Sequence, residues 1–395
     1  MKRNQRQPLQ LYVGESETSD RHASWLELFF DLVFVVAIAE LAHFLHDHLD
    51  WGGIASFAVL FVPVWWLWID FSYYADQFDV ERGFYRLVML GVMFGMIVLA
   101  LTISEALQGG SAEFASIYAA LRLVIVSLYF QAWRLVPQSR ELTKRYMLSF
   151  AIALVLWLIS IALPPPIRFV LWGVALLIEI SNGPITYATI RSVPVQVSHM
   201  DERFGLFVII VLGEAIVAVA SGVSDIQWQW QETLTAISGF IAAVSFWWLY
   251  FECAETSVIN WALRSNQKSA LLRSFVYGYG HVFVFAGIVA SGVGIQSAIE
   301  GVEAGLSIEA RAVLCGGMAL FLLGLTAVQW AAPRSLPQQI LSGRTAAVIA
   351  CVLLIVLGGW LAPAAILGLL VLILLGLIQV ESIFARITGQ TDSPD

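Results

Sequence analysis

Long apolar stretches separated by short polar segments run through nearly the whole sequence. A helix needs about 20 mostly apolar residues to cross the hydrocarbon core of a bilayer. Twelve stretches meet this requirement, and each is bounded by glycine, proline or clustered charge. They are residues 25–45, 53–75, 87–107, 114–134, 146–163, 167–188, 204–222, 233–252, 274–298, 312–331, 345–361 and 363–380. The pattern predicts an all-α polytopic membrane protein, a bundle of about twelve transmembrane helices.

The last two stretches are short, and only Leu361, Ala362 and Pro363 separate their apolar cores. They form either a tight hairpin of two helices or one broken helix. No part of the chain alternates apolar and polar residues over a sustained length, which argues against a membrane β-barrel.

Composition agrees with this interpretation. Hydrophobic residues make up 59% of the 395 residues and charged residues 13%, and the mean hydropathy is +0.79. Soluble domains average about 25% charged residues, so the natural partner of this chain is the lipid bilayer. The three cysteines lie far apart without paired spacing, which predicts neither a disulfide framework nor a zinc site.

The distribution of basic residues predicts the orientation in the membrane. If the N-terminus is cytoplasmic, 18 of the 21 Lys and Arg residues fall on the cytoplasmic side. Only Arg168 and Arg311 fall outside, and Arg122 lies within a span. Because cytoplasmic loops carry an excess of Lys and Arg, both termini are expected in the cytoplasm.

An internal repeat links the two halves of the chain. The segment WWLWID (65–70) matches WWLYFE (247–252), and both lie at the cytoplasmic ends of their spans. These matches pair two acids, Asp70 and Glu252. One span earlier, Asp31 and Glu214 each precede a Val- and Ala-rich run. The offsets of 182 and 183 residues favour two six-helix repeats of the same topology.

The predicted domain organisation follows from this repeat. A cytoplasmic tail (1–24) precedes the first repeat (25–190), and a cytoplasmic linker (191–203) leads to the second repeat (204–381). A cytoplasmic tail (382–395) ends the chain.

Asp31 and Glu214 stand out because placing a carboxylate within a membrane span costs free energy. Insertion of Asp at a helix centre costs about 2.5–3.5 kcal/mol, so intramembrane acids are candidates for ion pathways. Asp31 lies about 9 Å inward from Trp25, and Glu214 about 15 Å into its span. For Asp31 the alternative is a structural hydrogen bond or ion pair between helices.

The sixth span carries a third deep acid, Glu179, shortly before Asn182, Gly183 and Pro184. Proline removes a backbone donor and disturbs the preceding turn, which frees carbonyls for a cation or water. This combination predicts a discontinuous helix at a binding site. The alternative is an ordinary proline kink beside a buried, protonated glutamate.

A basic residue within the fourth span requires a partner. Arg122 lies about 12 Å from the outer end of its span. It is therefore expected to meet Asp31, Glu40, Glu179 or Glu214, or to reach a water-filled cavity. Snorkelling to the membrane surface is the alternative.

Histidines complete the candidate chemistry. His281, the only histidine inside a predicted span, is either a proton relay or a hydrogen-bonded core residue. His43, His46 and His48 lie near two aspartates at the outer end of the first span. A solvated helix end is favoured there over a metal site, because His48 turns away from the other two.

No phosphate-binding loop, nucleophile elbow or zincin motif occurs in the sequence. We therefore predict no enzymatic activity, no cofactor, no metal and no nucleic-acid partner.

Four motifs resemble the bacterial low temperature requirement protein A family. They are ELFFDLVFVVAIAEL (27–41), WWLWIDFSYYADQFD (65–79), ERFGLFVIIVLGEAIVAVASG (202–222) and WWLYFE (247–252). The resemblance covers about residues 20–385. It implies a polytopic inner-membrane protein linked in name to growth in the cold, and it supplies no mechanism.

A second likeness is more distant. Phe29-Phe30-Asp31 is similar to the Phe-x-Asp of two-repeat endolysosomal potassium channels, whereas Leu212-Gly213-Glu214 departs from that pattern.

The favoured function is secondary transport of an unknown small solute, coupled to protons or monovalent cations. Asp31, Glu179 and Glu214 would carry the coupling and Arg122 would act as countercharge. The alternatives are an ion channel with two six-helix repeats, or a non-transporting scaffold or lipid-linked protein that supports growth in the cold.

Overall fold

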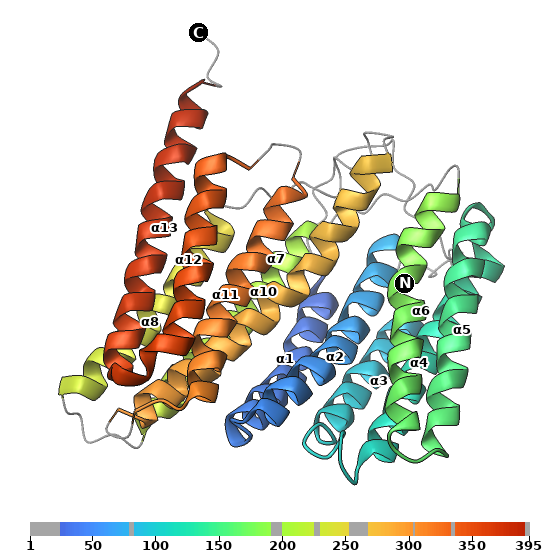
Figure 1. Ribbon diagram of the computed structural model, residues 1–395. Helices are drawn as coiled ribbons and strands as arrows, with labels where there is room; N and C mark the ends of the chain where they lie inside the picture. The colour runs from blue at the N-terminus through green and yellow to red at the C-terminus, as the bar shows by residue number, and fades with distance from the viewer. Residues whose placement is uncertain are drawn as a thin grey trace, which may run out of the picture. The chain divides into compact units, whose positions relative to one another are not determined.

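The computed structural model describes residues 24–78, 83–190, 200–224, 230–252, 268–302, 305–332 and 336–391. These residues form twelve α-helices long and apolar enough to cross a membrane, and no β-strand (Figure 1). The helices are α1 (Trp25–Asp47), α2 (Trp51–Gln77), α3 (Gly83–Ala100), α4 (Ser111–Leu135), α5 (Arg140–Ile161), α6 (Ile167–Thr189), α7 (Met200–Ser224), α8 (Trp230–Phe251), α10 (Lys268–Glu300), α11 (Ile308–Trp330), α12 (Gln338–Leu357) and α13 (Pro363–Thr391).

The twelve predicted spans are confirmed, with corrections at several ends. The third span was expected to continue to residue 107, but α3 ends at Ala100 and turns follow as far as residue 110. The hydroxyl of Thr102 donates to the carbonyl of Leu99 at 2.7 Å, and its backbone N–H donates to the same carbonyl at 3.0 Å. These local bonds replace the helical pattern.

The predicted N-terminal tail and linker lie largely outside the described residues. Of the N-terminal tail only residue 24 is described, and of the linker only residues 200–203. The predicted C-terminal tail, from residue 382, begins within α13, which continues to Thr391.

The last two spans are separate helices that pack against each other. A short 3-10 turn (Gly358–Trp360) ends α12, and Pro363 begins α13. Proline suits the first position of a helix, where its missing N–H has no helical partner to lose. The hairpin is therefore the correct alternative.

Contacts divide the chain into two compact units. Unit 1 comprises residues 1–37, 63–203 and 259–275, and unit 2 comprises residues 38–62, 204–258 and 276–395. In unit 1, the successive helices α3, α4, α5 and α6 pack against one another. In unit 2, α8 packs against α13 and α11 against α12. The units differ from the two predicted repeats, because α1 and α2 contribute to both units.

Within unit 2, α10 and α11 approach each other closely through glycine. The contact residues are Gly287 and Gly294 on α10 and Gly317 and Gly324 on α11. A Cβ atom built on any of the four would lie only 2.4–2.7 Å from a backbone atom of the other helix. Small residues allow helix backbones to touch in this way within membranes.

Candidate functional site

Helix α2 carries two polar side chains that enter different buried clusters of unit 1. Trp68 and Asp70 are two residues apart, so they leave the helix about 200° apart and at nearly the same height. Trp68 meets Asp31, and Asp70 meets Arg122. One helix thus connects both clusters.

The first cluster is the Asp31–Arg203 pair. Oδ1 of Asp31 accepts hydrogen bonds from Nη2 of Arg203 and from Nε1 of Trp68, each at 2.7 Å. The guanidinium also lies 5.8 Å from the ring centroids of Trp68 and Phe30. All four residues are buried. Arg203 thus balances the charge of Asp31, and the indole of Trp68 adds a second hydrogen bond to the same oxygen.

A capping box starts the helix that holds Asp31. The N–H of Glu27 donates to Oγ of Ser24 at 3.3 Å, and the N–H of Ser24 donates to Oε2 of Glu27 at 2.7 Å. This reciprocal pair satisfies two donors at the N-terminus of α1. Glu27 therefore has a capping role, and its partners differ from those of Asp31 one turn further along.

The second cluster is the Arg122 triad, formed by Arg122 of α4, Asp70 of α2 and Glu179 of α6. Nη1 of Arg122 donates to Oδ2 of Asp70, and Nη2 lies 2.7 Å from Oε2 of Glu179. Nη2 also donates to the hydroxyl of Tyr118 at 2.7 Å, and that hydroxyl donates to the carbonyl of Pro63 at 3.3 Å. The guanidinium and both carboxylates are shielded from solvent.

The triad brings together only part of what the sequence predicted. Glu179 was expected as a partner of Arg122 and is one. Asp70 was expected only as a repeat-related acid at the cytoplasmic end of its span, so its contact with Arg122 was missed. Asp31, a further expected partner, instead binds Arg203.

Placing Arg203 in the cytoplasmic linker was wrong. Arg203 belongs to the first turn of α7 and is 2% exposed. The predicted span began at Phe204 because the apolar run begins there, whereas the helix itself starts at Met200. The acids of its first turn, Asp201 and Glu202, were the available signal, since acids favour helix N-termini.

The predicted break in the sixth span is also wrong. Helix α6 is continuous from Ile167 to Thr189, with Pro184 inside it. A proline removes only one backbone donor, so a helix can continue through it. Asn182 uses its side chain within the helix, where Oδ1 accepts from the hydroxyl of Thr186 at 3.1 Å. Asn182 and Gly183 are buried like Glu179.

His281 of α10 has hydrogen-bond partners at both ring nitrogens. Nδ1 lies 2.7 Å from the carbonyl of Tyr277, and Nε2 lies 2.9 Å from the hydroxyl of Tyr250. A carbonyl only accepts, so Nδ1 carries a proton, and in a neutral ring Nε2 accepts from the hydroxyl of Tyr250. The ring stacks on Phe204 at 4.2 Å. Both ring nitrogens are thus hydrogen-bonded within the core, and the role of His281 as a proton relay stays a prediction.

The repeat-related acids have different surroundings. Asp70 is buried in the triad, whereas Glu252 follows the last residue of α8 and is exposed. Their neighbours differ in the same way, because Trp66 is 3% exposed and Trp248 is 41% exposed. The matching segments therefore present their side chains to different environments, and the repeat stays a prediction.

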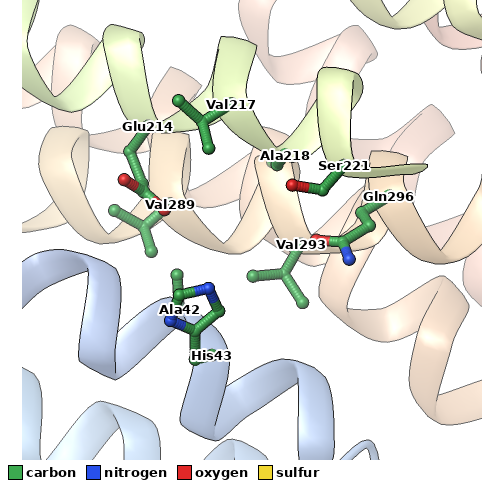
Figure 2. Close-up of a pocket in the computed structure, with 10 residues that line it drawn as sticks. Ala42, His43, Glu214, Val217, Ala218, Ser221, Val289, Val293 and Gln296 are labelled. Carbon is green, nitrogen blue, oxygen red and sulfur yellow. The ribbon is translucent and has the colours of Figure 1, made fainter. Parts of the chain in front are cut away.

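Glu214 lies in a pocket of unit 2 (Figure 2). Three helices, α1, α7 and α10, line this pocket. Its residues are Ala42, His43, Glu214, Val217, Ala218, Ser221, Val289, Gly292, Val293 and Gln296. Unlike Asp31 and Glu179, Glu214 has no lysine or arginine partner among the described residues.

The histidines near the end of α1 have three different surroundings. His43 lines the pocket, and Nε2 of His46 lies 3.0 Å from Oε2 of Glu300. Nδ1 of His48 donates to the carbonyl of Phe44 at 2.9 Å. Across the described part of the chain, no group of three or more His, Cys, Asp or Glu residues is placed to hold a metal ion.

Comparison with known proteins agrees with the architecture. The family model described as bacterial low temperature requirement A protein matches residues 22–379. An uncharacterized protein of Rhizobium meliloti (strain 1021) is 31% identical over 337 residues, which cover 82% of this chain and 81% of the relative. The chain is a multi-pass membrane protein and belongs to the bacterial low temperature requirement A (LtrA) family.

Proposed function

We propose that this protein is a secondary transporter of the inner membrane, coupled to protons or monovalent cations, with both termini in the cytoplasm. The observation that carries the proposal is the Arg122 triad. One buried guanidinium serves two buried carboxylates, Asp70 and Glu179. The excess of basic residues in the predicted cytoplasmic segments supports the orientation.

The net negative charge of the triad favours the binding of a cation. With all three groups charged, the site carries one uncompensated negative charge. An uncompensated buried charge costs several kcal/mol, and binding one proton or one monovalent cation removes it. The triad therefore has two charge states, which is the minimum requirement of a coupling site.

Helix α2 links the triad to the Asp31–Arg203 pair, so a change of charge at the triad can act on that pair. A change at Asp70 acts on the same helix that holds Trp68 against the Asp31–Arg203 pair. The bound cation would thus influence how α1, α2, α4, α6 and the start of α7 pack within unit 1. A second solute, of unknown identity, would use this change to cross the membrane.

A non-transporting scaffold is the second candidate, and the other ion pairs favour it. Asp31 and Arg203 compensate each other one to one. Arg344 of α12 and Glu381 of α13 do the same through two parallel hydrogen bonds of 2.7 Å. Neutral pairs of this kind hold helices in register without binding anything further.

Reconstitution in liposomes tests the proposal. Purified protein is placed in vesicles with an imposed pH gradient or membrane potential, and dyes report both. We expect Na⁺, K⁺ or a solute from a panel of amino acids, amines and polyols to dissipate the gradient. The change Glu179→Gln removes the excess charge and should lower that flux at least tenfold. Asp70→Asn tests the other carboxylate.

Glu113→Gln is the matched control, because Glu113 is an exposed acid on the same helix as Arg122. It should transport like the wild type. Wild-type vesicles as tight as empty ones across the whole panel would overturn the proposal and favour the scaffold. Equal flux in Glu179→Gln would remove the triad from the coupling mechanism.

A further inference from the structure

Arg311, in the first turns of α11, is a buried cation without a carboxylate partner. Its side chain is shielded, with the residue 7% exposed. The other buried arginines that the structure describes, Arg122, Arg203 and Arg344, each have a carboxylate oxygen 2.7 Å away. Arg311 makes one side-chain hydrogen bond, from Nε to the carbonyl of Ser307 at 3.3 Å. Within the described part of the chain, nothing balances its charge.

The guanidinium of Arg311 lies against the short turn that joins α12 to α13 (Figure 1). A Cβ atom built on Gly359 would lie 2.9 Å from Nη1 and 3.3 Å from Nη2, and one built on Gly358 would lie 3.7 Å from Nη1. The two glycines therefore leave the space that the guanidinium fills. Nη1 is shielded from solvent and has no hydrogen-bond partner. Nη2 has none either, but it is not shielded, so it is the atom that a ligand can reach.

Two described acids flank the loop before α11, and neither serves Arg311. Glu300 ends α10, and its carboxylate oxygens lie 2.8 Å from Nε2 of Gln296 and 3.0 Å from Nε2 of His46. Glu309 is two residues before Arg311, so it leaves α11 about 200° away. The C-terminus of α12 offers a partial charge of only about −0.5. A group with a full negative charge would complete the surroundings of Arg311.

The turn beside Arg311 is expected at the level of the lipid headgroups. It lies between two membrane spans, residues 338–360 and 363–384, so it marks the end of both. Trp360 in this turn is 97% exposed, and tryptophan is enriched where a membrane meets water. The headgroup region of a bilayer borders its hydrocarbon core at this level, and guanidinium groups form strong charge-assisted hydrogen bonds with phosphate. A lipid phosphate is therefore the anion within reach.

We propose that Arg311 binds the phosphate of an anionic phospholipid at the turn between α12 and α13. Nη2 contacts the phosphate, and the acyl chains lie along the exposed apolar side chains of Val356 and Leu357 on α12. The lipid supplies the full negative charge that the buried guanidinium lacks. A zwitterionic lipid binds more weakly, because its own cationic group already neutralises its phosphate. This site goes beyond the proposed transport and does not depend on it.

Lipid binding is measured on the full-length protein in detergent, by native mass spectrometry and by the shift in unfolding temperature. The probes are phosphatidylglycerol, phosphatidylcholine with the same acyl chains, and sodium phosphate. We expect phosphatidylglycerol to bind at least tenfold more tightly than phosphatidylcholine and to raise the unfolding temperature. Sodium phosphate at the same concentration should have no effect.

Variants test whether the charge of Arg311 holds the lipid. Arg311→Gln should remove one tightly bound phosphatidylglycerol per protein and at least half of the temperature shift. Arg145→Gln is the control and should bind normally, because Arg145 is 36% exposed and already pairs with Glu141. Gly359→Asp keeps Arg311 but places a carboxylate beside its guanidinium, so it should also remove the bound lipid. Gly359→Asn has the same size without the charge and should keep it.

Three results would overturn the proposal. The first is a wild type with no preference for phosphatidylglycerol, and the second is Arg311→Gln with lower stability but undiminished lipid binding, which would make Arg311 a packing residue only. The third is an equal Arg311-dependent shift with sodium phosphate, which would assign the site to a free anion. If Arg311→Gln does not fold, the Gly359 variants decide, and equal lipid binding by the Asp and Asn variants would refute the role of charge.

Discussion

Removing one member of the Asp31–Arg203 pair is the most direct test of the buried charges. The change Arg203→Met leaves the carboxylate of Asp31 with only the indole of Trp68 as a partner. Breaking a buried ion pair from one side costs about 3–5 kcal/mol, because the other charge stays uncompensated. We expect Arg203→Met to lower the free energy of unfolding by that amount, and Asp31→Asn to cost a similar amount by stranding Arg203.

The double variant should recover most of the loss. Asn at position 31 keeps an oxygen for the N–H of Trp68, while Met at position 203 keeps the apolar contacts of the arginine stem. Replacing both partners of a buried pair is often neutral or stabilising. We therefore expect the double variant to lie within about 1 kcal/mol of the wild type.

The assay is unfolding of the detergent-solubilised protein by sodium dodecyl sulfate, followed by tryptophan fluorescence. Arg145→Met is the control, because Arg145 is 36% exposed and pairs with Glu141 along α5. Such exposed pairs contribute about 0–1 kcal/mol. Purely additive losses in the double variant would refute the reasoning, since they would show that the two charges do not compensate each other.

Two further predictions use the same assay. Gly294→Ala places a Cβ atom 2.4 Å from Cα of Leu314 and should cost about 1–3 kcal/mol, whereas Gly368→Ala, with nothing within 4 Å, should cost nothing. A Gly294→Ala variant as stable as Gly368→Ala would contradict the close approach of α10 and α11. Tyr250→Phe leaves Nε2 of His281 buried without its donor and should cost about 1–3 kcal/mol. No loss in this variant would show that another donor serves the ring.

The helices were predictable because lipid selects for apolar composition over the whole length of a span. All twelve appear in the structure, including the pair around Pro363. Their ends were harder to predict wherever a charged residue is buried inside a helix. Arg203 and Arg344 were both assigned to cytoplasmic segments, yet both lie in helices and are 1–2% exposed. Hydropathy counts such residues as polar and cannot register that a partner neutralises them.

Partner choice was predictable only in part. An intramembrane arginine needs an acid, and Glu179 was correctly expected among the possible partners of Arg122. Asp70 was not expected there, because the meeting of three helices depends on how each is rotated about its axis. The sequence sets which residues share a face of one helix. The sequence does not set which faces of different helices meet. The way these faces meet decides whether Arg122 has one carboxylate partner or two.

The glycine contacts between α10 and α11 restrict where unit 2 can move. Where two backbones touch, no layer of side chains lies between them that could change rotamer and let one helix slide past the other. These two helices should therefore move as one rigid body. Any motion that widens the pocket around Glu214 must then come from α1 or α7, the two pocket helices outside that body.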